Sequence, residues 1–155
     1  MLAMVTVTVD TAWAIFAKST LQRAVRLAVR TGVTLTATQM AQGACLTDTV
    51  KKTVQANALG LLNGQSGYNL IKVNYFQPPA PNSNGPAVDV SGSPSGDAPG
   101  NIMQVSVQNF VLVPILPRFF DWKTAADKKS TIFANVNSAD LIEPSRNPPC
   151  IGTAP

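Results

Sequence analysis

The chain has 155 residues, of which 45% are apolar and only 13% are charged, and its net charge is +4. A chain of this length forms one domain with a real core and leaves little room for two. Histidine is absent, which removes the commonest acid/base side chain near neutral pH and the commonest metal ligand. No GxSxG motif or glycine-rich phosphate loop is present either. We therefore expect neither an enzyme nor a cofactor, and no small-molecule substrate.

Basic residues concentrate in the N-terminal part of the chain, which raises the question of nucleic-acid binding. Such binding usually relies on denser Lys/Arg clusters or on aromatic residues interleaved with them. Neither pattern occurs here, so nucleic acid is not expected as a partner.

The first segment, residues 1–17 (MLAMVTVTVDTAWAIFA), is apolar apart from three threonines and Asp10. It is shorter than a membrane span and lacks the basic start and cleavage site of a secretory signal, so we expect retained structure. Valine and threonine alternate from residue 5 to 9, which favours a strand. The helical composition that follows, with no Gly or Pro before Gly32, favours a single long helix.

Small residues form a ridge along this predicted helix. Ala24, Ala28 and Gly32 recur every four residues, a spacing that allows another helix to approach closely. The ridge predicts packing against neighbouring subunits, so that Ala28→Leu should obstruct this contact with little effect on the folding of the head. The residues assigned to the assembly surface are Trp13, Phe16, Leu21, Ala24, Val25, Ala28, Val29 and Gly32.

Charged residues lie on other parts of the same helix. Arg23, Arg26 and Arg30 are spaced as neighbours on one face and form either a solvated stripe or an interface with acidic partner residues. Asp10 lies within the apolar segment, where a carboxylate is costly unless it meets a partner. We therefore expect Asp10 to be a charge partner for a neighbouring subunit.

A second helix is predicted over residues 45–62 (CLTDTVKKTVQANALGLL), with Thr47 as its N-cap. Cys45 at its start and Cys150 near the C-terminus are the only cysteines, and neither belongs to a CxxC pair. We expect a disulfide between them, which would remove roughly 4 to 5 kcal/mol of unfolded-chain entropy. Two buried free thiols are the alternative.

Three strands are predicted over residues 69–76, 102–113 and 130–142, from their β-branched and alternating apolar residues. Residues 77–101 are rich in Pro, Gly, Ser and Asn and should form a long exposed loop. Two carboxylates in this loop, Asp89 and Asp97, match no calcium-binding pattern, so no metal site is expected.

Three segments of the chain resemble the TadE/TadG-like family of pseudopilins, from the tight-adherence branch of type IV pilus machinery. They are WAIFAKSTLQRAVRLAVRTGV from Trp13, CLTDTVKKTVQANALGLL from Cys45 and SADLIEPSRNPPC from Ser138. The likeness covers nearly the whole chain, and its first segment is the most specific. The family's leader and processing site have no counterpart in this sequence, so the role of the family's glutamate near the processed end is not transferred to Asp10.

The resemblance and the residue patterns together predict an α+β, pilin-like fold. In this fold a long N-terminal helix and a second helix pack on a small antiparallel sheet of about three strands. The expected division is an N-terminal hydrophobic assembly helix at residues 1–38 and a disulfide-tied α+β head at residues 39–155, with the exposed loop at 77–101.

The function implied is that of a structural subunit assembling through its N-terminal helix into, or at the tip of, an extracellular pilus-like filament. Its expected partners are other copies or related pilin subunits, and the inner membrane of the cell envelope before assembly. The alternative is a monomeric, envelope-anchored adhesion or ligand-binding module that uses residues 77–101 and the aromatic cluster Phe119, Phe120 and Trp122 as its contact surface. These aromatics are otherwise expected to plug the core.

Overall fold

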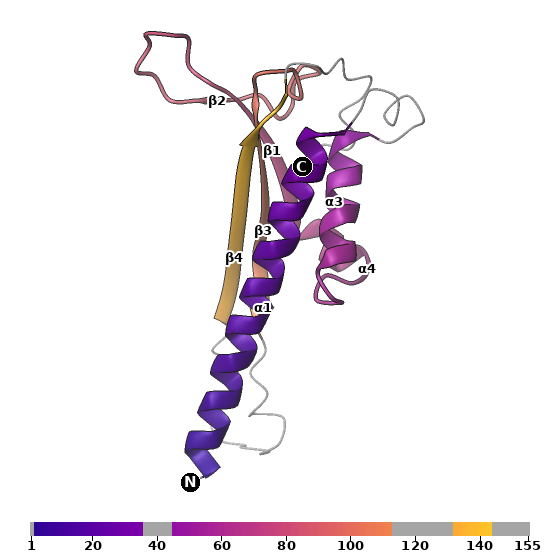
Figure 1. Ribbon diagram of the computed structural model, residues 1–155, viewed down its shortest axis with the longest axis vertical. Helices are drawn as coiled ribbons and strands as arrows, with labels where there is room; N and C mark the ends of the chain where they lie inside the picture. Colours follow the sequence, from indigo (N-terminus) through magenta and orange to yellow (C-terminus); the bar gives the residue numbers. More distant parts are fainter. Residues whose placement is uncertain (1, 36–44, 113–131, 144–155) are drawn as a thin grey trace.

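A computed structural model describes residues 2–35, 45–112 and 132–143 of the chain. In chain order they form α1 (Leu2–Val33), α3 (Leu46–Asn57), α4 (Gly64–Asn69), β1 (Ile71–Gln77), β2 (Val88–Asp89), β3 (Ile102–Leu112) and β4 (Ile132–Leu141). The described strands form one antiparallel sheet in the order β2-β1-β3-β4. Helices α1 and α3 lie side by side against this sheet (Figure 1). The architecture is therefore a mixture of helices and an antiparallel sheet, with a long N-terminal helix.

Helix α1 runs without interruption for 32 residues, which confirms the predicted single helix and excludes a strand at residues 5–9. Threonine hydroxyls in this stretch form hydrogen bonds with backbone carbonyl oxygens of the preceding helical turn. The hydroxyl of Thr8 donates to the carbonyl oxygen of Val5 at 2.7 Å, and that of Thr11 to the carbonyl oxygen of Val7 at 2.8 Å. The N-terminal part of α1 extends beyond the sheet, whereas its C-terminal part lies against the sheet and α3 (Figure 1).

One hydrophobic core joins α1, α3 and the sheet. Burial alternates along β1, where Ile71, Val73 and Tyr75 point inward, as expected for a strand with one covered face. Because the C-terminal part of α1 belongs to this core, the predicted assembly helix and the predicted head share one packing unit. The largest fully buried side chains are Tyr75, Leu21, Leu46, Leu62, Ile71, Met103, Ile142, Val25, Val50, Val54 and Val73.

Gly32 marks a close approach of α1 to its neighbours. A Cβ atom at this position would lie 2.5 Å from Cε of Met103 in β3 and 2.7 Å from Cγ2 of Val50 in α3. Both distances are too short for a real side chain, so the glycine lets helix and sheet meet here. The last residue of the small-residue ridge therefore serves packing inside the chain.

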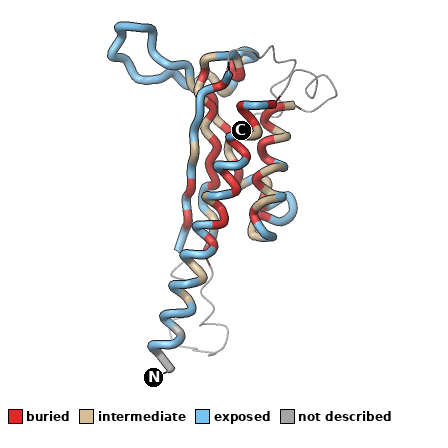
Figure 2. The backbone as a smooth tube through the Cα atoms, in the orientation of Figure 1, coloured by how far each residue is buried: buried red, intermediate tan, exposed pale blue. Residues whose placement is uncertain are grey.

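The sheet has four strands rather than the predicted three. The extra strand, β2, lies within the predicted loop and pairs with the end of β1, Phe76 opposite Asp89 and Gln77 opposite Val88. The segment from residue 77 to 89 is exposed throughout, as predicted (Figure 2). The loop prediction is wrong near its end, where Gly96 and Asp97 are buried.

The second helix is shorter than predicted. It ends at Asn57, and the chain then turns through Leu59 and Gly60, both with positive φ, before the short helix α4. Thr47 is not the N-cap, because Cys45 occupies that position and makes no side-chain cap bond. Thr47 is instead buried, and its hydroxyl lies 3.0 Å from the hydroxyl of Tyr75, which ties α3 to β1.

Candidate assembly surface

Most of the predicted assembly surface lies inside the protein's own core. Leu21, Ala24, Val25 and Ala28 are 0% exposed, and Val29 and Gly32 are also buried. Their assignment to an intersubunit surface is therefore wrong. The small side chains do allow a close helix contact, but the elements that approach are α3, β3 and β4 of the same chain.

The two remaining predicted residues, Trp13 and Phe16, lie where the covered and the uncovered parts of α1 meet. Their rings stack with centroids 5.9 Å apart and an interplanar angle of 27°. Trp13 is half-buried and Phe16 is exposed, whereas the next residue, Ala17, is completely buried. The aromatic pair thus marks the boundary between two halves of one helix.

The N-terminal half of α1 carries apolar side chains that no described residue covers. Val5 is 60% exposed, Val9 46% and Phe16 48%, and Ala12 between them is also exposed (Figure 2). Their spacing of four, three and four residues places them on one side of the helix. We call this set of four residues the apolar face of α1. Met4, Val7 and Ile15 lie on other sides of the same half of the helix and are exposed as well.

Asp10 lies within the same half of α1 and is half-buried. It already takes part in an interaction within the chain, which is one way for a carboxylate to be tolerated in an apolar segment. The role of Asp10 as a charge partner for another subunit stays a prediction.

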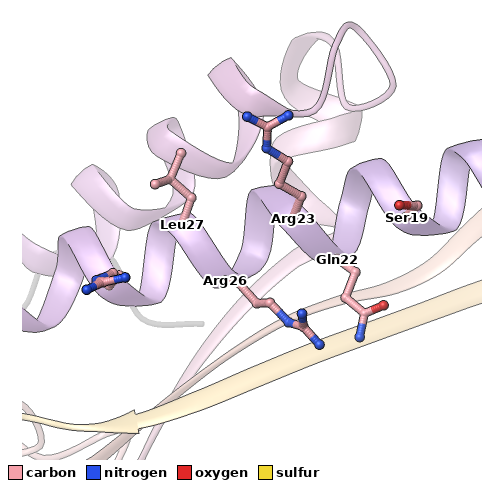
Figure 3. A pocket seen from close by; sticks show the side chains of 6 residues that line it. Ser19, Gln22, Arg23, Arg26 and Leu27 are labelled. Carbon is pink, nitrogen blue, oxygen red and sulfur yellow. The ribbon is translucent and has the colours of Figure 1, made fainter.

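A shallow, open depression of about 390 Å³ lies at the surface of the C-terminal half of α1, and its described lining residues all belong to that one helix. Arg26 and Gln22 extend on the side of β4, and Arg23 extends away from it (Figure 3). The residues that line the depression are Ser19, Gln22, Arg23, Arg26, Leu27 and Arg30.

A cluster of polar side chains joins α3 to α4. The hydroxyl of Tyr68 donates to Oδ1 of Asp48 at 2.9 Å, and Nζ of Lys51 lies 5.1 Å from the centre of the Tyr68 ring. Burial, the hydrogen bond to Asp48 and the charge of Asp48 raise the pKa of Tyr68 to about 12. Burial lowers the pKa of Lys51, and nearby Lys72 lowers it further, while Asp48 opposes the shift.

This cluster was not predicted from the sequence. Its tyrosine lies on α4, whose sequence GQSGYN contains two glycines and carries no helical signal. The arrangement fastens α4 to α3 through one hydrogen bond and one cation–π contact.

Cys45 is disulfide-bonded. Its predicted partner, Cys150, lies outside the described residues, as do Phe119, Phe120 and Trp122 of the predicted aromatic cluster. The pairing and the role of the aromatics stay predictions.

The described part of the chain offers no group of three or more His, Cys, Asp or Glu residues arranged to hold a metal ion. Asp89 instead accepts hydrogen bonds from the hydroxyl and the backbone N–H of Ser91, at 2.6 and 2.9 Å, which lower the pKa of its carboxyl. Among the described helices, none is both long enough and apolar enough to cross a membrane.

Taken together, the described residues define a helix-and-sheet protein with a main hydrophobic core, a small second cluster at Ala17, and a half-helix that both leave uncovered. Comparison of the chain with protein-family models, with curated proteins and with solved structures gave no match. The likeness to TadE/TadG-like pseudopilins therefore stays a hypothesis based on the three segments quoted above.

Proposed function

We propose that the protein is a structural, pilin-like subunit that assembles through the N-terminal half of α1. Its partners are other copies of itself or related subunits, and the product is an extracellular filament or the tip of one. Before assembly the subunit is held at the inner membrane of the cell envelope. The mechanism is association rather than catalysis.

The observation that carries this proposal is the apolar face of α1, formed by Val5, Val9, Ala12 and Phe16. Burying apolar area stabilises an assembly by roughly 25 cal/mol per Å². A row of exposed apolar side chains on a protruding helix is unfavourable in water and typical of a protein–protein contact. Spacings of four and three residues are also those with which helices pack on one another.

The arrangement of the head supports the same function. The C-terminal half of α1 is fixed in the core by α3 and the sheet, so the protruding half can bury its apolar side chains without unfolding the head. The disulfide at Cys45 fits a protein that works in an oxidising compartment outside the cytoplasm.

The test is assembly of the full chain, measured by sedimentation velocity and by negative-stain electron microscopy. Val5→Ser combined with Val9→Ser should abolish polymers, because both changes remove apolar area from the face. The matched control is Val88→Ser, since Val88 is 59% exposed on β2, far from α1. The control should assemble like the unmodified chain, and all variants should keep the same melting temperature.

Two outcomes contradict the proposal. The first is a full chain that stays monomeric at every concentration tested, which favours the monomeric adhesion or ligand-binding module. The second is loss of assembly in the Val88 control to the same extent as in the double variant, which would place the contact elsewhere on the surface.

A further inference from the structure

We propose that two copies of this chain pair edge to edge through β4, as antiparallel strands related by a two-fold axis at Asn137. Each copy keeps its sheet in the order β2-β1-β3-β4, and the two sheets join into one. The contact lies on a different element from the apolar face of α1, so the inference goes beyond the proposed function.

The first argument is the open backbone edge of β4. In the described sheet β4 is the last strand and pairs with β3 alone, and Figure 1 shows it at the margin of the molecule. The backbone N–H of Ile142 donates to the carbonyl oxygen of Asn101, on the side of β3, at 2.8 Å. Because successive residues of a strand direct their backbone groups to opposite sides, those of Leu141, Ala139 and Asn137 face the open edge.

The second argument is that little on this edge opposes strand pairing. Natural edge strands are often kept apart by lysine, by proline or by being very short. The ten residues of β4 include no Lys, Arg or Pro and one charged residue, Asp140. Large apolar side chains lie exposed towards both ends of the strand, Phe133 at 54% and Leu141 at 52%. The strand is therefore suited to pair with another strand.

The third argument is that the exposed side of β4 is symmetric about Asn137. Phe133 and Leu141 lie four residues to either side of it, with Asn135 and Ala139 between them. In an antiparallel pair centred on Asn137, Phe133 of each copy lies directly opposite Leu141 of the other copy. A two-fold contact between identical chains requires such self-complementarity. The pattern therefore favours a second copy over an unrelated extended peptide.

This register also extends an apolar row across both sheets. Within one copy Val111 of β3 lies opposite Phe133, and Ile102 of β3 lies opposite Leu141. Phe76 of β1 lies opposite Ile102 in turn. The joined sheet would carry a row that begins with Val111 and Phe133 of one copy and continues with Leu141, Ile102 and Phe76 of the other. Moving one strand by two residues separates Phe133 from Leu141 and breaks the row, so the row specifies the register.

The dimer differs from the proposed assembly in its direction. Helix α1 and strand β4 run the same way in each copy (Figure 1), and antiparallel pairing reverses one copy relative to the other. The two protruding half-helices then point in opposite directions. The β4 contact therefore does not use the apolar face of either α1.

The test is dimerisation of the full chain carrying Val5→Ser and Val9→Ser, measured by sedimentation equilibrium. These two changes remove polymerisation through α1 and leave β4 unchanged. In this background Phe133→Ser takes one apolar side chain per copy out of the row and should raise the Kd of the dimer at least about tenfold. The matched control is Val88→Ser, because Val88 is similarly exposed but lies on β2 at the opposite edge of the sheet. It should keep the Kd within about twofold.

Two variants of equal net charge test the register in the same background. Asn135→Asp combined with Ala139→Lys sets a carboxylate directly opposite an ammonium group of the other copy, twice in each dimer. Asn135→Asp combined with Asn137→Lys sets two ammonium groups opposite each other at the two-fold axis. Opposite charges stabilise a cross-strand pair and like charges destabilise it, so the first variant should dimerise at least about fivefold more tightly. All three positions are exposed, so the melting temperatures should stay the same.

Three results overturn the inference. One is a background chain that stays monomeric at every concentration tested, and another is an equal loss of dimer in Phe133→Ser and Val88→Ser. The third is an equal or reversed order of affinity in the two charge variants, which would exclude the register centred on Asn137.

The same measurements separate this inference from the proposed function. If the unmodified chain polymerises but the Val5→Ser and Val9→Ser background is monomeric, only the β4 dimer is wrong. If the background forms the β4 dimer but the unmodified chain forms no polymer, only the proposed assembly is wrong.

Discussion

The two halves of α1 differ in composition and in surroundings, and the more apolar N-terminal half is the one that the described core leaves exposed. In the C-terminal half, Leu21 and Ala28 are buried by α3 and the sheet, whereas in the N-terminal half Val5 and Ile15 lie exposed. Composition alone does not predict which half is buried, since the N-terminal half is the more apolar of the two. The fold separates them, because the sheet ends level with Ala17, which packs with Ala134 of β4 and Leu112 of β3. The C-terminal half therefore contributes to stability, whereas no described residue packs over most of the N-terminal half.

The largest difference between the halves should appear on truncating one large side chain in each. Leu21→Ala removes a completely buried side chain and should lower the free energy of unfolding by about 3 kcal/mol. Ile15→Ala removes an exposed one and should change it by less than about 0.5 kcal/mol. Urea denaturation of both variants measures the contrast, and equal losses would show that the two halves are covered alike.

Enlarging a small residue in each half gives the second largest effect. Ala28→Leu inserts extra atoms between α1 and its neighbours and should cost about 2 kcal/mol by overpacking. This corrects the expectation that the change leaves the folding of the head unaffected. Ala12→Leu in the exposed half should leave stability within about 0.5 kcal/mol. Thermal unfolding compares the two, and a fully stable Ala28→Leu protein would contradict the observed packing.

A substitution in the polar cluster of Tyr68, Asp48 and Lys51 tests the stability of the head separately from α1. Tyr68→Phe removes the hydrogen bond to Asp48 and should cost about 1 kcal/mol at neutral pH, after allowance for partial exposure. The phenol has its ordinary pKa of 10.0 when unfolded and about 12 when folded. Its contribution is therefore complete below pH 10 and is lost as the pH rises towards about 12. Urea midpoints should fall over this range in the unmodified chain and less steeply in the variant.

The smallest effect on overall stability is expected for Ala12→Gly. Glycine weakens a helix by about 1 kcal/mol locally, but the N-terminal half of α1 contributes little to the core. The free energy of unfolding should therefore change by less than about 0.5 kcal/mol. Amide hydrogen exchange should become faster at residues 4–16 and stay unchanged at residues 21–29. Faster exchange in both ranges would mean that the halves unfold together.

Local patterns in the sequence were sufficient to predict the main elements. Continuous helical composition without Gly or Pro before Gly32 defined α1. Alternation of β-branched and aromatic residues located β1, β3 and β4 to within a few residues. The exposed segment at residues 77–89 followed from its Pro, Ser and Asn content. In each case the signal lies within the element itself.

Contacts between distant residues could not be predicted in the same way. The ridge Ala24, Ala28 and Gly32 indicates that something packs closely there, but the same pattern serves a neighbouring subunit or the chain's own α3 and β3. The strand β2 is only two residues long and exists because it pairs with the end of β1. The helix α4 has no helical signal of its own and is held by Tyr68. Most of the residues assigned to the assembly surface therefore lie on the side of α1 that is buried in the core.

The continuity of α1 has a mechanical consequence. No turn or glycine interrupts the helix between its exposed N-terminal half and Gly32, so the chain has no hinge there. Tension applied to the N-terminal end would load the contacts of α1 with α3, β3 and β4 in shear, all at once rather than one after another. Sliding the helix out would also require Gly32 to leave its place between Val50 and Met103. A pulling force on the N-terminal end would therefore pass directly into the core.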